Sequence, residues 1–178
     1  MDLSGRHIGF ALTGSHCTIP VIWPVLDDLL AKGADIFPII SNSVARTDTR
    51  FGRASEIVAR FTKVCGRQPW CDLVSVEGIG PRSLLDVMVV APCTGNTLAK
   101  LAHGISDTPV TLACKAHLRN ERPVVIALST NDGLSGNAVN LATLLGRRNY
   151  YFVPFGQETT SWTHTVGKVC PSIGNQKS

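Results

Sequence analysis

The sequence has no long apolar segment and no long run of charges of one sign. None of its apolar runs reaches the ~18 residues that a membrane span requires, and the first residues contain no apolar signal core. We therefore expect a cytoplasmic protein without membrane contact. The net charge is +4, from 17 Lys and Arg against 13 Asp and Glu, and the longest basic run is Arg147-Arg148. Because cations are scattered, no nucleic-acid partner is expected.

Several sequence motifs are also missing. The 6 cysteines form neither a CxxC pair nor a cluster with histidine, so we predict no metal site and a reduced setting. The sequence contains no GxxxxGK[ST], GxGxxG or HExxH. This excludes the P-loop, the common dinucleotide fingerprint and a zinc-protease helix.

Apolar runs typical of strands alternate with segments of helical periodicity. Strands are predicted over residues 7–12, 35–40, 70–76, 85–90, 124–128 and 150–153, with helices between them and an irregular polar loop over 41–51. Pro38 cannot donate a ladder hydrogen bond, which favours an edge position for its strand. This alternation predicts a three-layer α/β sandwich with an open, mainly parallel sheet over residues 1–157. Residues 158–178 lack periodicity and are expected to form an irregular tail.

Three loops rich in small and amide residues follow predicted strands. Because such loops meet at the carboxyl edge of a parallel sheet, we expect one pocket there, suited to a phosphate-bearing mononucleotide. Helix capping alone would explain each loop taken separately. The candidate cofactor-binding residues are Thr13, Gly14, Ser15, Pro92, Thr94, Asn96, Thr97, Ser129 and Asn131.

Two further residues are candidates for substrate binding. Arg50 could hold a carboxylate through two hydrogen bonds, although an arginine beside Asp48 is often a solvated surface pair. His16, in the first loop, could act as an acid or base, or could only cap or pack the next helix. No catalytic residue is identified.

The spacing of the loops resembles the FMN-binding flavoproteins that include the cysteine decarboxylases. That family has Thr-Gly-Ser in its first loop, matched by Thr13-Gly14-Ser15. Its central Pro-x-x-x-Asn-Thr motif, followed by Ala-Lys-x-Ala-x-Gly-Ile-x-Asp, is matched from Pro92 to Asp107. Two family features are absent: residues 41–52 contain no histidine, and Leu128–Gly133 replaces the Pro-x-Met-Asn-x-x-Met-Trp clamp. These departures argue against decarboxylation of a cysteine.

Within the family, the chain is most similar to subunits of a two-subunit oxidoreductase of spore-forming bacteria. The resemblance implies that FMN contacts the three loops, that NADP binds the partner subunit, and that the substrate is a small dicarboxylate, with Arg50 as its first candidate ligand. It also implies a homo-oligomer. An FMN-dependent decarboxylase of a cysteine-derived substrate and a scaffold subunit without cofactor remain as alternatives.

Overall fold

Five parallel strands form the centre of the protein. The computed structural model describes residues 2–155, and the strand order is β2-β1-β3-β4-β5, with every neighbouring pair parallel. The strands are β1 (His7–Leu12), β2 (Asp35–Ile40), β3 (Val87–Cys93), β4 (Val124–Leu128) and β5 (Tyr150–Phe152). The predicted three-layer α/β sandwich with an open parallel sheet is confirmed.

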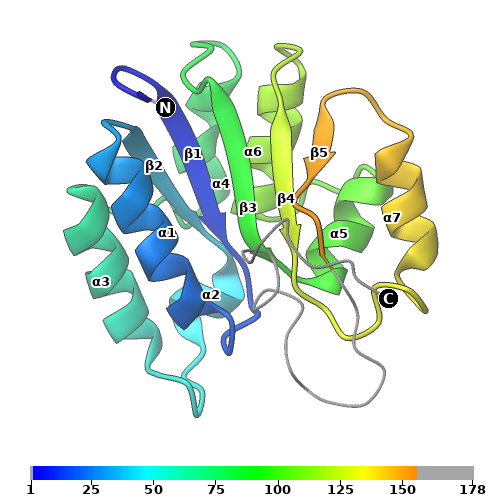
Figure 1. Ribbon diagram of the computed structural model, residues 1–178, viewed down its shortest axis with the longest axis horizontal. Coiled ribbons are helices and arrows are strands. Elements are labelled where there is room, and N and C mark those ends of the chain that lie inside the picture. Colours follow the sequence, from blue (N-terminus) through cyan, green and yellow to red (C-terminus); the bar gives the residue numbers. More distant parts are fainter. Residues whose placement is uncertain (1, 156–178) are drawn as a thin grey trace, which may run out of the picture.

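Helices cover both faces of the sheet (Figure 1). One face carries α1 (Ile19–Ala31) and α3 (Ala54–Cys65), and the other carries α4 (Leu73–Val76), α5 (Gly95–Ala102), α6 (Pro109–Leu118) and α7 (Ala138–Leu145). The short helix α2 (Asn42–Arg46) follows β2, and a 3-10 turn, η1 (Glu77–Ile79), follows α4. The sheet thus separates two apolar cores, one around Phe10 and Phe61 and the other around Met88 and Leu98.

Burial on both faces explains why the central strands are apolar runs without alternation. In β1, every residue after His7 is buried. Pro38 lies in β2, which is an edge strand of the sheet, as predicted. None of the helices within residues 2–155 is long and apolar enough to cross a membrane.

The structure differs from the sequence prediction in three segments. Residues 70–76 are not a strand: Trp70 makes only an isolated bridge to Ile39, and α4 follows, capped by the Asp72 side chain, which accepts a hydrogen bond from the Ser75 amide at 2.8 Å. The predicted loop 41–51 contains α2. Strand β3 extends to Cys93, so that Pro92 belongs to the strand end, beside an irregularity in its pairing with β4. The predicted tail, 158–178, lies outside the described residues.

Candidate functional site

Thr13 joins the ends of the two central strands. Its hydroxyl donates to the carbonyl of Pro92 at 2.7 Å and accepts from the amide of Thr94 at 2.9 Å, and the residue is 1% exposed. The loop after β1 is therefore fixed to the loop after β3 at the point where the strand order reverses. Nucleotides bind at this point in open parallel sheets. The Thr13 hydroxyl holds the two loops of such a site together, because its hydrogen is donated to the carbonyl of Pro92.

The loop after β4 is held to the same place by serine and threonine hydroxyls. The Ser15 hydroxyl donates to the carbonyl of Ser129 at 2.8 Å, and the hydroxyls of Thr18 and Ser129 lie 2.8 Å apart. The three predicted loops thus converge at the lower edge of the sheet in Figure 1. Thr18, the residue before α1, makes no side-chain cap; its hydroxyl serves this contact between loops.

Glycine makes room at two positions where side chains from other elements come close. A Cβ atom at Gly14 would lie 2.8 Å from the hydroxyl oxygen of Ser43, and one at Gly95 would lie 2.5 Å from the side-chain nitrogen of Asn137. Ser43 belongs to α2, and its hydroxyl lies 2.9 Å from that of Ser41. The connection from β2 to α2 is therefore a fourth part of the site. This part was not predicted, because these serines lie in a segment that was expected to be an irregular loop.

Helix α5 starts at the site and presents its amino end there. The hydroxyl of Thr94 caps the helix by accepting the amide of Thr97 at 3.2 Å, and it also donates to the Thr97 hydroxyl at 3.0 Å. The next amides, of Gly95 and Asn96, belong to the first turn, whose N–H groups have no acceptor within the helix. Asn96 is exposed on this turn, whereas Thr97 is buried. These N–H groups and the helix dipole favour an anion at this position.

Acid and amide side chains close the site on the β4 side. The carboxylate of Asp132 accepts from the Asn137 amide group at 2.8 and 2.9 Å and from the Thr130 hydroxyl. Hydrogen bonds from Thr130 and then Asn137 lower the pKa of the Asp132 carboxyl, so it is ionised at neutral pH. Asn131, a predicted ligand, is exposed next to this cluster. Asp132 does not cap α7 with its side chain; it orders the loop instead.

His16 borders a small cavity beside the converging loops. The cavity, of about 170 Å³, lies between α1, α3 and the turn at Phe51 and Gly52, and His16, Trp23, Glu56 and Arg60 also line it. Within residues 2–155, the Nδ1 atom of His16 is buried without a hydrogen-bond partner. Burial lowers the pKa of the His16 imidazole, so the ring is neutral at pH 7.

One of the two predicted substrate-binding residues, His16, lines this cavity, and the other, Arg50, directly precedes the lining residue Phe51. The guanidinium of Arg50 stands over the ring of Phe51, 4.8 Å from its centre, and is exposed. The carboxylate of Asp48 accepts a hydrogen bond from the amide of Ala54, at the start of α3, at 2.9 Å. Arg60 was not predicted; its guanidinium stands over the Trp23 ring, 4.7 Å from the ring centre. No sequence signal could have identified it, because it is one of several charged residues on the exposed face of α3.

Comparison with known proteins agrees with this architecture. The family model described as Flavoprotein matches residues 1–160. The chain belongs to the Flavoprotein family.

Two relatives share more than 40% sequence identity with this chain. The B subunit of dipicolinate synthase from Bacillus subtilis (strain 168) is 44% identical over 157 residues, which are 88% of this chain and 78% of that protein. The crystal structure of the B subunit of dipicolinate synthase from Bacillus halodurans C superposes with a TM-score of 0.80 at 42% identity, covering 89% of this chain and 82% of that one. The resemblance found in the sequence is therefore confirmed.

A solved structure of lower sequence identity shares the fold. It is a dodecameric FMN-dependent UbiX-like decarboxylase from Escherichia coli O157:H7, with a TM-score of 0.68 at 20% identity, covering 92% of this chain and 88% of that one. At this identity the likeness establishes only the fold.

Proposed function

We propose that the protein is the B-type subunit of a dipicolinate synthase, acting in the cytoplasm of the mother cell of a sporulating bacterium. With an A subunit that binds NADP, it would oxidise dihydrodipicolinate to dipicolinate. The substrate loses a hydride equivalent, which NADP⁺ accepts, and one proton. The observation that carries the proposal is the 44% identity over 157 residues to the B subunit of a dipicolinate synthase.

We further propose that the converging loops hold FMN. The residues fit its phosphate, since the Thr94-capped amino end of α5 offers free first-turn N–H groups. The hydroxyls of Thr13 and Ser15 hold the surrounding backbone rigid by bonding to Pro92 and Ser129. When bound, a flavin can accept and donate hydride equivalents. His16 lies in the loop after β1, and its buried Nδ1, which has no hydrogen-bond partner within residues 2–155, is available to a ligand.

The dicarboxylate substrate is assigned to the neighbouring cavity. Arg50, whose guanidinium stands over the lining residue Phe51, would pair with one carboxylate, and Arg60, which lines the cavity, would pair with the second. The neutral ring of His16 would accept at Nδ1 the proton that the substrate loses, and the imidazolium formed would lie beside the substrate carboxylates.

The flavin proposal is tested by adding a negative charge where the phosphate is expected. Asn96→Asp changes an exposed residue in the first turn of α5, so the fold should persist while FMN affinity falls at least tenfold. The matched control is Gln68→Glu, which adds the same negative charge at an exposed residue close to Arg67. Arg67 pairs with Asp35 at the amino end of β2. Quenching of FMN fluorescence on titration measures the FMN affinity of each variant. Equal affinities of the two variants for FMN would refute the assignment.

The substrate proposal is tested by Arg50→Ala in the co-expressed two-subunit complex. We expect weaker use of substrate, seen as a raised KM for dipicolinate formation, and unchanged FMN uptake. Arg82→Ala removes another exposed arginine and serves as the control. Equal loss of substrate use and FMN uptake in Arg50→Ala would contradict the assigned role.

A scaffold subunit without cofactor is the second candidate, and one observation favours it. The hydroxyls of Thr13, Ser15 and Thr94 all donate hydrogen bonds within the protein, so several predicted ligand groups already have partners. A colourless protein that takes up no FMN and still raises the turnover of the A subunit would support this alternative. A yellow protein whose activity depends on FMN would refute it.

We also propose a homo-oligomer that covers one side of the sheet. On the side of the sheet that α1 covers, the strand residues Val89 and Val153 are only half-buried. Tyr151, in β5, is 57% exposed. On α1 itself, Val21 and Val25 are each 47% exposed. Such apolar surface is typical of subunit contacts. Light scattering after size exclusion should give a multiple of 19.1 kDa; a monomer at micromolar concentration would exclude it.

A further inference from the structure

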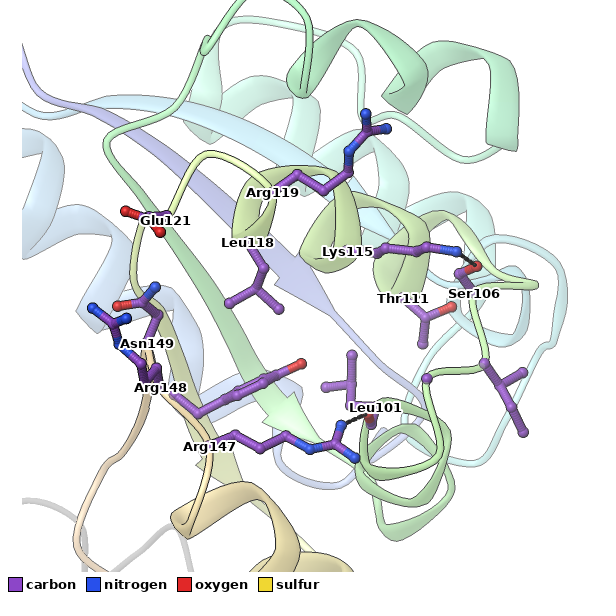
Figure 2. A pocket seen from close by; sticks show the side chains of 13 residues that line it. Leu101, Ser106, Thr111, Lys115, Leu118, Arg119, Glu121, Arg147, Arg148 and Asn149 are labelled. Atoms are coloured by element: carbon purple, nitrogen blue, oxygen red, sulfur yellow. Dashed lines mark hydrogen bonds between the residues drawn. The ribbon is translucent and has the colours of Figure 1, made fainter.

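A second and larger cavity lies away from the loops that form the proposed flavin site. It measures about 470 Å³ and is lined by residues from the end of α5, one side of α6 and the start of β5 (Figure 2). Its walls include Glu121, before β4, and Asn149, before β5. Because these residues precede strands whereas the converging loops follow strands, the cavity lies toward the opposite edge of the sheet.

The inner surface of this cavity is mainly apolar. Leu101 and Leu118 come from α5 and α6. Ile105 lies on the connection between these helices, and Tyr150 is the first residue of β5. In Figure 2 the side chain of Leu118 extends from α6 into the cavity. Burial raises the pKa of the Tyr150 phenol, which therefore stays protonated as a hydrogen-bond donor. Such a surface would bury an apolar ring or chain.

The charged groups around the cavity are mostly cations. Lys115, Arg119, Arg147 and Arg148 line it together with a single acid, Glu121. The guanidinium of Arg147 donates to the carbonyls of Leu101 and Ala102 at 3.2 and 2.6 Å, which fixes it at the end of α5. An anion entering the cavity would therefore meet a net positive rim.

Lys115 has its charge available for a ligand. Its ammonium group contacts the Ser106 hydroxyl at 3.4 Å, a neutral and weak partner, and within residues 2–155 no carboxylate pairs with it. The nearby Lys100 differs, because its ammonium lies 2.8 Å from a carboxylate oxygen of Asp107. Figure 2 shows Lys115 and Arg147 reaching the cavity from different sides.

We propose that this cavity binds a small amphipathic anion, an apolar ring or chain that carries a carboxylate. The apolar walls take the ring, and Lys115 with the hydroxyl of Ser106 takes the carboxylate. The volume lies in the range typical of small-molecule sites, which are concave and mostly apolar with few polar groups. The site is separate from the flavin and substrate sites proposed above.

The test uses 2-naphthoate as the probe and the neutral 2-naphthamide as its isostere, each titrated by calorimetry into the full chain saturated with FMN. We expect 2-naphthoate to bind about tenfold more tightly than the amide, the size of one charge-assisted hydrogen bond. Lys115→Met should remove this difference and leave amide binding unchanged. Ile105→Trp, at a residue that is 46% exposed, should fill the cavity and weaken both probes.

Two matched variants serve as controls. Lys63→Met removes an exposed lysine of α3, and Val74→Trp adds an indole at a residue of α4 that is 77% exposed; neither should change binding. Thermal unfolding of each variant checks that it is folded. Equal affinity for the two probes, full affinity in Ile105→Trp, competition between 2-naphthoate and FMN, or no binding at millimolar concentration would each overturn the proposal.

Discussion

Replacing Thr13 by valine should destabilise the protein by removing one hydroxyl from its centre. Valine keeps nearly the same shape, so little packing is lost. The hydroxyl, however, satisfies two backbone groups, the carbonyl of Pro92 and the amide of Thr94, at 2.7 and 2.9 Å. Thr13 is 1% exposed and Pro92 is buried, so water cannot replace the bond to that carbonyl.

The size of the effect follows from these two contacts. An unsatisfied buried polar group costs about 1–3 kcal/mol. The Pro92 carbonyl should contribute the full amount, whereas Thr94 is half-buried and its amide can partly turn to water. We therefore expect a loss of about 2–4 kcal/mol in the free energy of unfolding, a substantial part of the roughly 5–15 kcal/mol typical of a domain.

Urea unfolding followed by circular dichroism measures this loss. With an m-value of about 2 kcal/mol/M, the midpoint should fall by about 1–2 M with little change in slope. Thr143→Val is the control, because the Thr143 hydroxyl donates at 2.8 Å to a carbonyl on the exposed side of α7. The control should stay within about 0.5 kcal/mol of the parent. If Thr13→Val behaved like the control, the hydroxyl would not be what joins β1 to β3.

Gly95→Ala should lower the urea midpoint by the equivalent of about 1–3 kcal/mol, because the new Cβ would lie 2.5 Å from the side-chain nitrogen of Asn137; an unchanged midpoint would show that Asn137 moves aside freely. Burial lowers the pKa of His117, which is 1% exposed, so protonation favours the unfolded chain, and stability should be full above the unfolded pKa near 6.5 and decline below it. Melting temperatures from pH 7.5 to 5 should fall less in His117→Gln than in the parent; parallel curves would contradict this. Burial raises the pKa of Cys114 to about 12. Iodoacetamide should therefore label the exposed Cys71 in the folded protein and spare Cys114, as peptide mapping would show; early labelling of Cys114 would contradict a closed core.

The sequence alone determined the layers of the fold and the sheet edge where the three loops converge. Apolar runs mark strands that are buried on both faces, and glycine- and threonine-rich loops follow β1 and β3, so the shared edge could be predicted. The segment 70–76 could not, because its apolar residues suit a strand, whereas the Asp72 cap and packing against α6 make it helical. Local sequence does not record which neighbour a short apolar segment will contact.

Only the tertiary structure decided what each polar side chain does. Thr13 and Ser129 looked like ligands because small hydroxyl residues after strands suit a phosphate, yet the fold uses them to tie loops that are far apart in sequence. The presence of Arg60 in the cavity that His16 also lines depends on how α3 packs. The position of Lys115, which pairs with no carboxylate within residues 2–155, depends likewise on α6. Periodicity reports whether a residue is buried, because burial repeats with the local backbone. Hydrogen-bond partners come from other elements, and they are fixed only when the chain closes on itself.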